Sequence, residues 1–197
     1  MQVKIIKNLS GIEGLCLIKP NVHEDERGYF METYNQNEMS EQGLAVKFVQ
    51  DNQSCSAKGV LRGLHFQINF PQCKLVRVIS GEIFDVAVDL RPNSNTYGKW
   101  HGEFLSADNK NQLLIPEGFA HGFLTLSLKA EMFYKVTDFY HPNDEGGIAW
   151  NDPSLGIDWG VLGNYNGTAS GDGYSLKDGT PLILSKKDSQ LRNLRKR

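Results

Sequence analysis

A histidine and two basic residues stand close together in one short stretch of the chain. Arg62 and His65 belong to the run Arg-Gly-Leu-His-Phe-Gln, and Lys74 follows shortly after it. An imidazole can take up a proton at neutral pH, and a nearby cation stabilises negative charge that develops on an oxygen atom. Removal of a proton from a carbon beside a carbonyl group requires both functions. The stretch therefore predicts acid–base chemistry on a carbonyl substrate.

A second histidine follows a tight corner further along the chain. The segment 116–123 reads Pro-Glu-Gly-Phe-Ala-His-Gly-Phe, and its Pro-x-Gly-x-x-His pattern resembles the second conserved motif of cupins, which are small double-stranded β-barrels. Many cupins hold a metal through a His-x-His pair, but here Gln67 stands where the second histidine would be. Gln is a poor transition-metal ligand and Lys74 would repel a cation, so we expect no metal. His121 is open to two interpretations, a site residue or a core histidine bonded to a backbone carbonyl.

Two polar runs have both a structural and a functional interpretation. Residues 25–30 are typical of a turn with solvated charges that leads into a strand, which would place Glu32 and Tyr34 on one face. The amides that begin at Gln50 follow a predicted strand over 46–49. Amides at a strand end usually form turns, and they are also suited to binding sugar hydroxyls and base edges.

Two further residues look ordinary when judged from the local sequence. Tyr134 shares a predicted strand face with Met132 and Val136, which is typical of a core ring whose hydroxyl lies at the rim. Asp188 follows two lysines, and its local context favours a surface or helix-start acid.

Short β-branched and aromatic runs dominate the chain, and Gly, Pro, Asn and Asp interrupt them about every ten residues. This spacing predicts an all-β sandwich or barrel. In the run 83–90, Asp85 and Asp89 give one face of a central strand its polar groups. We expect short helices over Asn37–Gln42 and Lys187–Arg195, and an irregular loop over 160–180. The strands are predicted over 15–18, 46–49, 75–79, 83–90, 112–115 and 131–136.

The bulk properties limit the class of protein. A chain of 197 residues with a net charge of −2 predicts a single domain over 1–197 and gives no reason to expect nucleic-acid binding. No apolar run is long enough to span a bilayer, so we expect no membrane partner. Cys16, Cys55 and Cys73 are odd in number and lack metal-type spacing, which predicts reduced thiols in a cytoplasmic protein.

Taken together and in this order, the motifs resemble the dTDP-4-dehydrorhamnose 3,5-epimerase family over nearly the whole chain. Two features depart from the family pattern: an apparent insertion over 163–180, and Cys73 where a small residue is more common. The matching stretches are 25–28, 50–52, 59–67, 72–77, 85–91, 115–123, 134–135, 150–153 and 184–188.

The resemblance implies a mostly β fold, a cupin-type double-stranded β-helix (jelly-roll) barrel with a few short helices, working without metal or cofactor. The implied reaction converts dTDP-4-dehydro-6-deoxy-D-glucose into dTDP-4-dehydro-L-rhamnose by inversion at C3 and C5 through enolates. The implied base is His65, oriented by Asp188, with Lys74 beside the enolate oxygen and Tyr134 as the acid on the opposite face.

The resemblance also implies a set of binding residues and a partner. Tyr140 would stack on the thymine ring, and Arg62 and His121 would line the sugar and diphosphate region. An N-terminal strand would cross to a second copy in a homodimer, so that each site draws on its neighbour. Further implied binding positions are Arg27, Glu32, Gln50, Asn52 and Glu145.

Three alternatives stay open at this point. The same scaffold and the same catalytic groups could serve an epimerase that inverts only C3 or only C5, or one that acts on another nucleotide-linked 4-keto sugar. A metal cupin is a second alternative, and His65-Phe66-Gln67 argues against it. A sugar-binding cupin without catalysis is the third.

Overall fold

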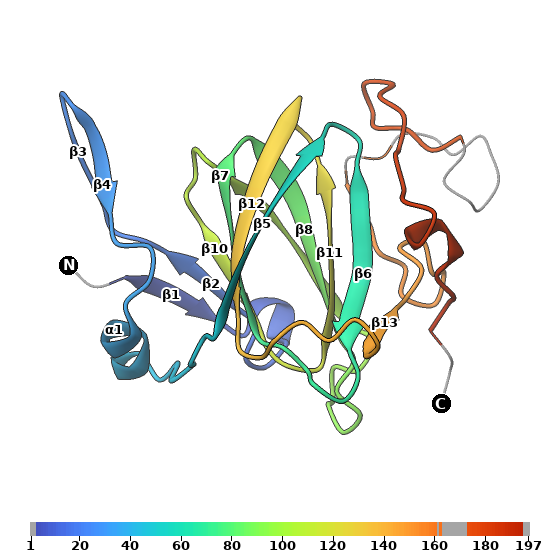
Figure 1. The fold of residues 1–197 in the computed structure, drawn as a ribbon, viewed down its shortest axis with the longest axis horizontal. Helices are drawn as coiled ribbons and strands as arrows, with labels where there is room; N and C mark the ends of the chain where they lie inside the picture. Colours follow the sequence, from blue (N-terminus) through green and yellow to red (C-terminus); the bar gives the residue numbers. More distant parts are fainter. Residues whose placement is uncertain (1–2, 161, 163–172, 195–197) are drawn as a thin grey trace.

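The computed structural model describes residues 3–160, 162 and 173–194, and two β-sheets that face each other form its body (Figure 1). This confirms the predicted mostly β barrel with few short helices. The six-stranded sheet has the order β1 (Lys4–Lys7), β2 (Cys16–Lys19), β10 (Gln112–Ile115), β7 (Lys74–Ser80), β12 (Lys129–Val136) and β5 (Gln50–Ala57). The five-stranded sheet has the order β13 (Glu145–Gly147), β6 (Leu61–Gln67), β11 (Phe119–Thr125), β8 (Glu82–Asp89) and β9 (Trp100–Ser106).

Alternation along the strands separates the core into layers. On β7, Val76 and Val78 point into the cluster between the two sheets, whereas Leu75 points outward to a cluster that includes Met39 of the helix α1 (Gln36–Glu41). β8 is covered on both faces, because Ile83 belongs to the cluster between the sheets and Val86 to the one behind the five-stranded sheet. The expectation of a central strand over 83–90 is therefore confirmed.

The strand predicted over 46–49 is wrong. The segment 46–49 contains no strand, and β5 begins at Gln50, at the amides that were expected to follow a strand. The reason is pairing: β5 lies antiparallel to β12 over its whole length, from Gln50 opposite Val136 to Ala57 opposite Lys129. Backbone hydrogen bonds, rather than β-branched side chains, define this strand.

The N-terminal region also corrects one prediction. β3 (Val22–Asp25) and β4 (Gly28–Met31) form a hairpin that extends away from the barrel (Figure 1). β4 ends at Met31, so Glu32 and Tyr34 do not share a strand face. The chain leaves the strand there because Asn35 caps α1, accepting hydrogen bonds from the backbone N–H groups of Asn37 and Glu38.

One helix prediction is confirmed and the other is wrong. α1 corresponds to the helix expected over Asn37–Gln42. The helix expected over Lys187–Arg195 is only a 3-10 turn, η2 (Asp188–Gln190), within the described residues. After this turn the backbone bonds to a distant segment instead: Ala149 N donates to Arg192 O at 3.0 Å. A second 3-10 turn, η1, covers Leu9–Gly11.

The three cysteines are free, as predicted. Cys16 and Cys73 are buried, and burial raises the pKa of Cys73 to about 12. Cys55 is exposed on β5, opposite Glu131 of β12. Of the loop predicted over 160–180, residues 161 and 163–172 lie outside the described residues, and the end that is described makes a bridge between Ser175 and Pro181.

Candidate active site

A cavity of about 350 Å³ opens between the two sheets. His65 and His121 line it from the five-stranded sheet, and Lys74 and Tyr134 line it from the six-stranded sheet. Strand register explains this convergence: His65 on β6 pairs directly with His121 on β11, and Tyr134 on β12 pairs with Asn52 on β5. The other predicted residues that line the cavity are Gln50, Asn52, Arg62, Tyr140 and Glu145.

His65 is in contact with a buried carboxylate. Its Nε2 atom lies 2.6 Å from Asp188 Oδ1, and Asp188 is 5% exposed. Ser185 Oγ donates a hydrogen bond to Asp188 Oδ2 at 2.7 Å. Burial acts to raise the pKa of Asp188, but the contacts with His65 and Ser185 outweigh it and hold the pKa below the usual value. The carboxylate is therefore charged and able to orient the ring and stabilise its protonated form.

The other ring nitrogen of His65 is free. Nδ1 is buried without a hydrogen-bond partner among the described residues, and the nearest acid is Glu145, with Oε1 at 3.7 Å. Glu145 in turn forms an ion pair with Lys187 and accepts a hydrogen bond from the Tyr140 hydroxyl at 3.1 Å. Because Asp188 holds Nε2, Nδ1 is the ring nitrogen whose hydrogen-bonding capacity is unused among the described residues.

Lys74 lies on β7 beside two carboxylates. Burial lowers its pKa to about 8, and the negative charges of Asp85 and Glu145 oppose part of that change. The ammonium group is therefore mainly charged at neutral pH and loses its charge in mildly alkaline solution. A charged ammonium at this place can stabilise an oxyanion in the cavity.

Tyr134 approaches the cavity from the sheet opposite His65. Burial raises the pKa of its phenol, while the positive charge of Arg62 acts in the other direction. The phenol thus keeps its proton at neutral pH, as a proton donor must. Arg62 itself donates from Nε to Ser56 Oγ at 3.1 Å.

His121 is neither a surface group nor a core histidine bonded to a backbone carbonyl. Its Nε2 atom lies 2.8 Å from Asp85 Oδ2, and both side chains are buried. The cavity is thus flanked by two histidine–carboxylate pairs on neighbouring strands. The structure favours the site interpretation of His121 over the alternative.

Two predicted residues are not brought to the cavity within one chain. Arg27 lies in the turn of the β3–β4 hairpin, where its guanidinium contacts Asp25 and its side chain is 83% exposed. Glu32 follows the hairpin and accepts a hydrogen bond from Asn35 Nδ2. Neither belongs to the set of residues that line the cavity.

Known proteins share both the sequence and this architecture. The family model described as dTDP-4-dehydrorhamnose 3,5-epimerase matches residues 10–196. The chain belongs to the dTDP-4-dehydrorhamnose 3,5-epimerase family. The enzyme of this name from Methanothermobacter thermautotrophicus is 60% identical over 150 residues, which are 76% of this chain and 81% of that one. The one from Escherichia coli is 56% identical over 150 residues, 75% of this chain and 81% of the relative.

Solved structures agree with the family assignment. The dTDP-6-deoxy-D-glucose-3,5-epimerase of Legionella pneumophila, solved with dTDP-4-keto-L-rhamnose, is 44% identical with a TM-score of 0.84, and the match covers 98% of this chain and 93% of that one. The predicted cupin-type fold is thereby confirmed, and so is the predicted enzyme class: this member of the dTDP-4-dehydrorhamnose 3,5-epimerase family is an isomerase.

The structure brings two further residues to the site of this epimerase-family member that residue types and spacing do not point to. The sequence predicts only that Asp85 lies on the polar face of a strand, whereas in the structure it is fully buried and bonds His121. Lys187 directly precedes Asp188 and reaches Glu145 at the cavity. The Lys-Lys-Asp run is visible in the sequence, but nothing in its local pattern shows that Lys187 reaches Glu145.

Proposed function

We propose that the chain inverts C3 and C5 of dTDP-4-dehydro-6-deoxy-D-glucose to give dTDP-4-dehydro-L-rhamnose, with no metal or cofactor. The observation that supports this most directly is that His65, backed by Asp188, and Tyr134 face one cavity from opposite sheets. Inversion at a carbon needs a base on one face of the sugar ring and an acid on the other. A single side chain could not easily do both.

In the first half of each inversion, the proton of the carbon beside the C4 ketone moves to the His65 imidazole. The electron pair of the broken C–H bond forms the enolate and leaves negative charge on the C4 oxygen. The Lys74 ammonium stabilises that charge, which lowers the barrier because the interaction is strongest when the charge has formed. Asp188 keeps the ring oriented and stabilises the imidazolium.

In the second half, the Tyr134 hydroxyl gives its proton to the same carbon from the other face. The enolate electron pair forms the new C–H bond and the ketone returns. The phenolate and the imidazolium then exchange protons with water. The raised pKa of Tyr134 fits this role, since the group must hold its proton until the enolate takes it.

Substitution of Tyr134 separates the two halves. We expect Tyr134→Phe to exchange substrate hydrogen with solvent deuterium at a nearly normal rate but to invert at least about 10²-fold more slowly. The exchange and the product are both followed by NMR. Equal loss of exchange and inversion would contradict the acid role.

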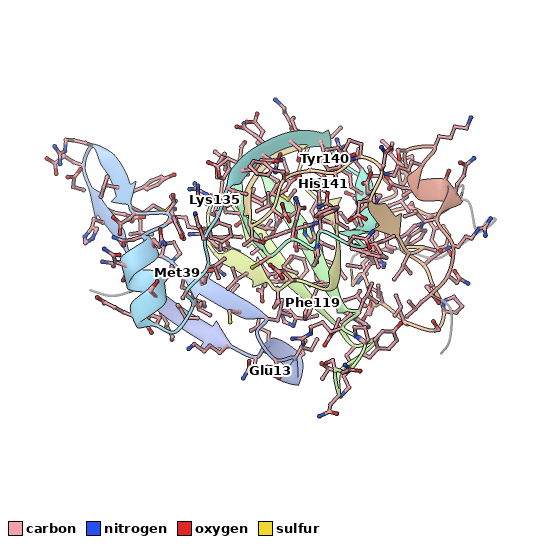
Figure 2. All side chains as sticks on the ribbon, turned by 60° about the horizontal axis from the view of Figure 1, so that its bottom comes forward. Glu13, Met39, Phe119, Lys135, Tyr140 and His141 are labelled. Atoms are coloured by element: carbon pink, nitrogen blue, oxygen red, sulfur yellow. The ribbon has the colours of Figure 1, made fainter. Side chains whose placement is uncertain are left out.

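The substrate's nucleotide part would bind at the rim. Figure 2 shows Tyr140 and His141 side by side over the barrel. Tyr140 is 54% exposed, which suits a ring that stacks on thymine. The backbone N–H of Tyr140 donates a hydrogen bond to Gln50 Oε1. The sugar and diphosphate would lie deeper, beside Arg62 and His121.

A second copy of the chain would complete the site. Because Arg27 and Glu32 do not reach the cavity of their own chain, they would serve the neighbour's cavity in a homodimer with an exchanged N-terminal hairpin. The exposed rings of Tyr29 and Phe30 on that hairpin fit burial against a partner.

The described residues contain no helix long and apolar enough to cross a membrane. Work in the cytoplasm, with reduced thiols, stays part of the proposal.

One experiment tests the reaction. The protein is incubated with dTDP-4-dehydro-6-deoxyglucose in deuterium oxide, and NMR counts the exchanged positions and identifies the product. Exchange at both C3 and C5 with the L-rhamno product supports the proposal. Exchange at one position only supports the single-position epimerase, and binding without any exchange supports the non-catalytic sugar-binding protein. Activity that a chelator abolishes would support a metal cupin.

A further inference from the structure

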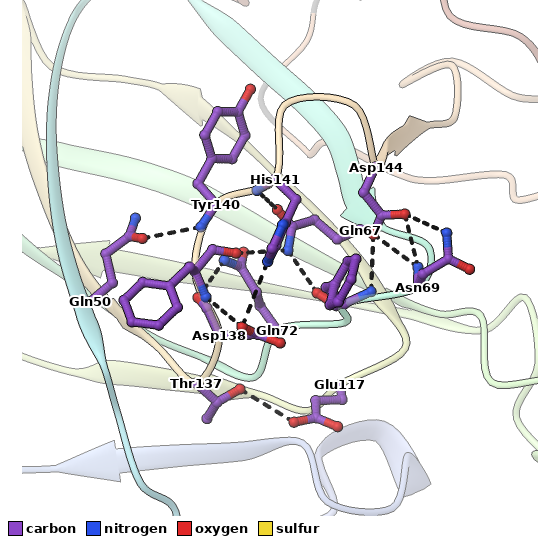
Figure 3. Close-up of polar contacts among 12 residues, drawn as sticks. Gln50, Gln67, Asn69, Gln72, Glu117, Thr137, Asp138, Tyr140, His141 and Asp144 are labelled. Atoms are coloured by element: carbon purple, nitrogen blue, oxygen red, sulfur yellow. Dashed lines mark hydrogen bonds and ion pairs between the residues drawn. The ribbon is translucent and has the colours of Figure 1, made fainter.

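We propose that Gln67 is a positioning residue for nucleotide recognition, which fixes the loop that presents Tyr140. The inference rests on the proposed function, in which Tyr140 stacks on the thymine ring. Gln67 occupies the place where many cupins have a second metal-binding histidine. In this chain its side chain is used for something else (Figure 3).

All hydrogen-bonding groups of the Gln67 amide are engaged around Tyr140. Nε2 donates to Phe70 O at 2.7 Å and to Phe139 O at 3.1 Å, and Oε1 accepts from His141 N at 2.7 Å. The last two partners are the residues on either side of Tyr140. The side chain is 8% exposed, so these bonds form with little competition from water.

A second anchor fixes the far end of the same loop. Asp144 accepts hydrogen bonds from the backbone N–H and the side-chain amide of Asn69, and from Phe70 N at 2.9 Å. The Phe70 ring also stacks on the His141 ring, with centroids 4.0 Å apart. Segment 138–144 is therefore tied to segment 67–70 at several points, and Gln67 supplies the bonds on both sides of Tyr140.

The position of the Tyr140 ring depends on this backbone more than on packing. Tyr140 is more than half exposed, and within the described part of the chain its hydroxyl bonds Glu145 alone. A ring that is already in place loses less conformational entropy when a base stacks on it. Gln67 would thus act on affinity for the nucleotide, while His65 and Tyr134 perform the proton transfers.

The chemistry of the side chain explains why Gln suits this position. An amide offers two N–H donors and one acceptor, which matches two carbonyl groups and one N–H group. A carboxylate would face two carbonyl oxygens without a proton, and a neutral imidazole has a single donor. No donor of Gln67 is left for a ligand, so the residue acts through Tyr140 rather than by touching the substrate.

The test compares Gln67→Met with the wild-type chain. The substitution keeps the length of the side chain and removes all three bonds. We expect the Kd for dTDP, measured by calorimetry, and the KM to rise about tenfold, with kcat within about twofold and an unchanged pH profile. Asn109→Leu is the matched control, because Asn109 also bonds backbone groups of its own loop, at Phe104 and Ser106, without lining the cavity.

A double-mutant cycle with Tyr140→Ala shows whether Gln67 acts through that ring. We expect the double variant to bind dTDP about as weakly as Tyr140→Ala alone, because the loop no longer carries a ring to position. Fully additive losses would overturn the inference, as would an unchanged Kd in folded Gln67→Met. If Gln67→Met does not fold, Asp144→Asn replaces it. The Kd for dTDP should then rise by a similar factor, and an unchanged Kd in this folded variant would overturn the inference.

The design separates this inference from the proposed function. A wild-type chain that does not bind dTDP would overturn both. A wild-type chain that binds dTDP and exchanges substrate hydrogen, together with a Gln67→Met variant whose Kd is unchanged, would overturn only the role of Gln67.

Discussion

Two neighbouring histidines line the cavity, and each is paired with a carboxylate. The two pairs differ in burial. His65 and His121 are directly paired across β6 and β11, and each contacts an acid. His121 is the more buried of the two, whereas His65 keeps Nδ1 free of hydrogen-bond partners within the described residues. This difference favours His65 as the group that moves protons and His121 as a binding group.

Removal of the charge on Asp188 tests that assignment. We expect Asp188→Asn to lower kcat by about 10²–10⁴-fold, because the ring loses its orienting anion and the imidazolium loses its counter-charge. The affinity for dTDP should stay within about twofold, since Asp188 lies behind His65 and away from the rim. The control is Asp178→Asn, which removes an acid paired with Lys58 on the surface. A kcat for Asp188→Asn equal to that of this control would contradict the assignment.

The lowered pKa of Lys74 predicts a reaction that is sensitive to alkaline pH. Its pKa is lowered to about 8, so the ammonium is charged below that pH and becomes neutral as the pH rises through it. We expect an alkaline limb in the pH profile, in which kcat/KM falls about tenfold per pH unit above the pKa of Lys74. The reason is that the neutral amine stabilises the enolate poorly. Lys74→Arg keeps its charge, and the limb should disappear even if the rate is lower. Tyr134 does not produce this limb, as its pKa is raised above the phenol's usual value. An unchanged limb in Lys74→Arg would show that another group titrates.

At the scale of the elements, β6 and β11 approach each other closely just beside the two histidines. Gly63 has a φ of +118°, and a Cβ atom there would lie 2.6 Å from Gly122 Cα. Gly98 also has a positive φ, but a Cβ atom at that position would meet nothing within 4 Å. The two glycines therefore separate backbone strain from steric exclusion.

Alanine substitutions at these glycines measure the difference. We expect Gly98→Ala to lower the free energy of unfolding by about 1 kcal/mol through the unfavourable φ alone. Gly63→Ala should lower it by about 3 kcal/mol or more, because the strands must also move apart. Urea unfolding of both variants gives the comparison. Similar losses for the two would mean that the strands adjust easily.

The same elements show how far the sequence could predict the fold. β7, β8, β10 and β12 carry β-branched and aromatic runs, and they were predicted from them. β5 is rich in amides, and the sequence predicts a strand over 46–49 instead, because the strand character of β5 comes from pairing with β12. The pattern of apolar residues predicts a strand that packs against a core. It does not predict a strand whose polar side chains point into a cavity.

The candidate site shows a similar division. His65, Arg62 and Lys74 were recognisable from residue types within one stretch. Asp188 was not, because its contact with His65 joins residues far apart in the sequence and local context favoured a surface acid. The family resemblance, rather than any spacing, placed Asp188 in the site.

At the scale of the whole molecule, the exposed hairpin predicts that activity requires two chains. If Arg27 serves the neighbour's cavity, Arg27→Ala and His65→Ala each inactivate the homodimer. A dimer with one chain of each kind has one cavity that carries both substitutions and one that carries neither. We therefore expect an equimolar mixture, unfolded and refolded together, to recover about a quarter of the wild-type activity.

Two controls make the mixing experiment decisive. Each variant refolded alone should stay inactive, and a mixture of His65→Ala with Tyr134→Phe should stay far below a quarter, because both of those residues belong to the same cavity of one chain. Light scattering gives the mass of each sample. A monomer by mass, or no recovery in the first mixture, would contradict the exchanged hairpin.

The three thiols differ in burial, so the rate of alkylation can report whether copies of the chain associate. Cys16 and Cys73 are buried, and burial raises both of their pKa values, so neither forms the reactive thiolate readily. Cys55 is left as the exposed thiol, on the outer surface of the six-stranded sheet. Its rate of alkylation therefore reports whether that surface is open or covered, and a rate that falls as the protein concentration rises would locate a contact between copies without any tag or added label site.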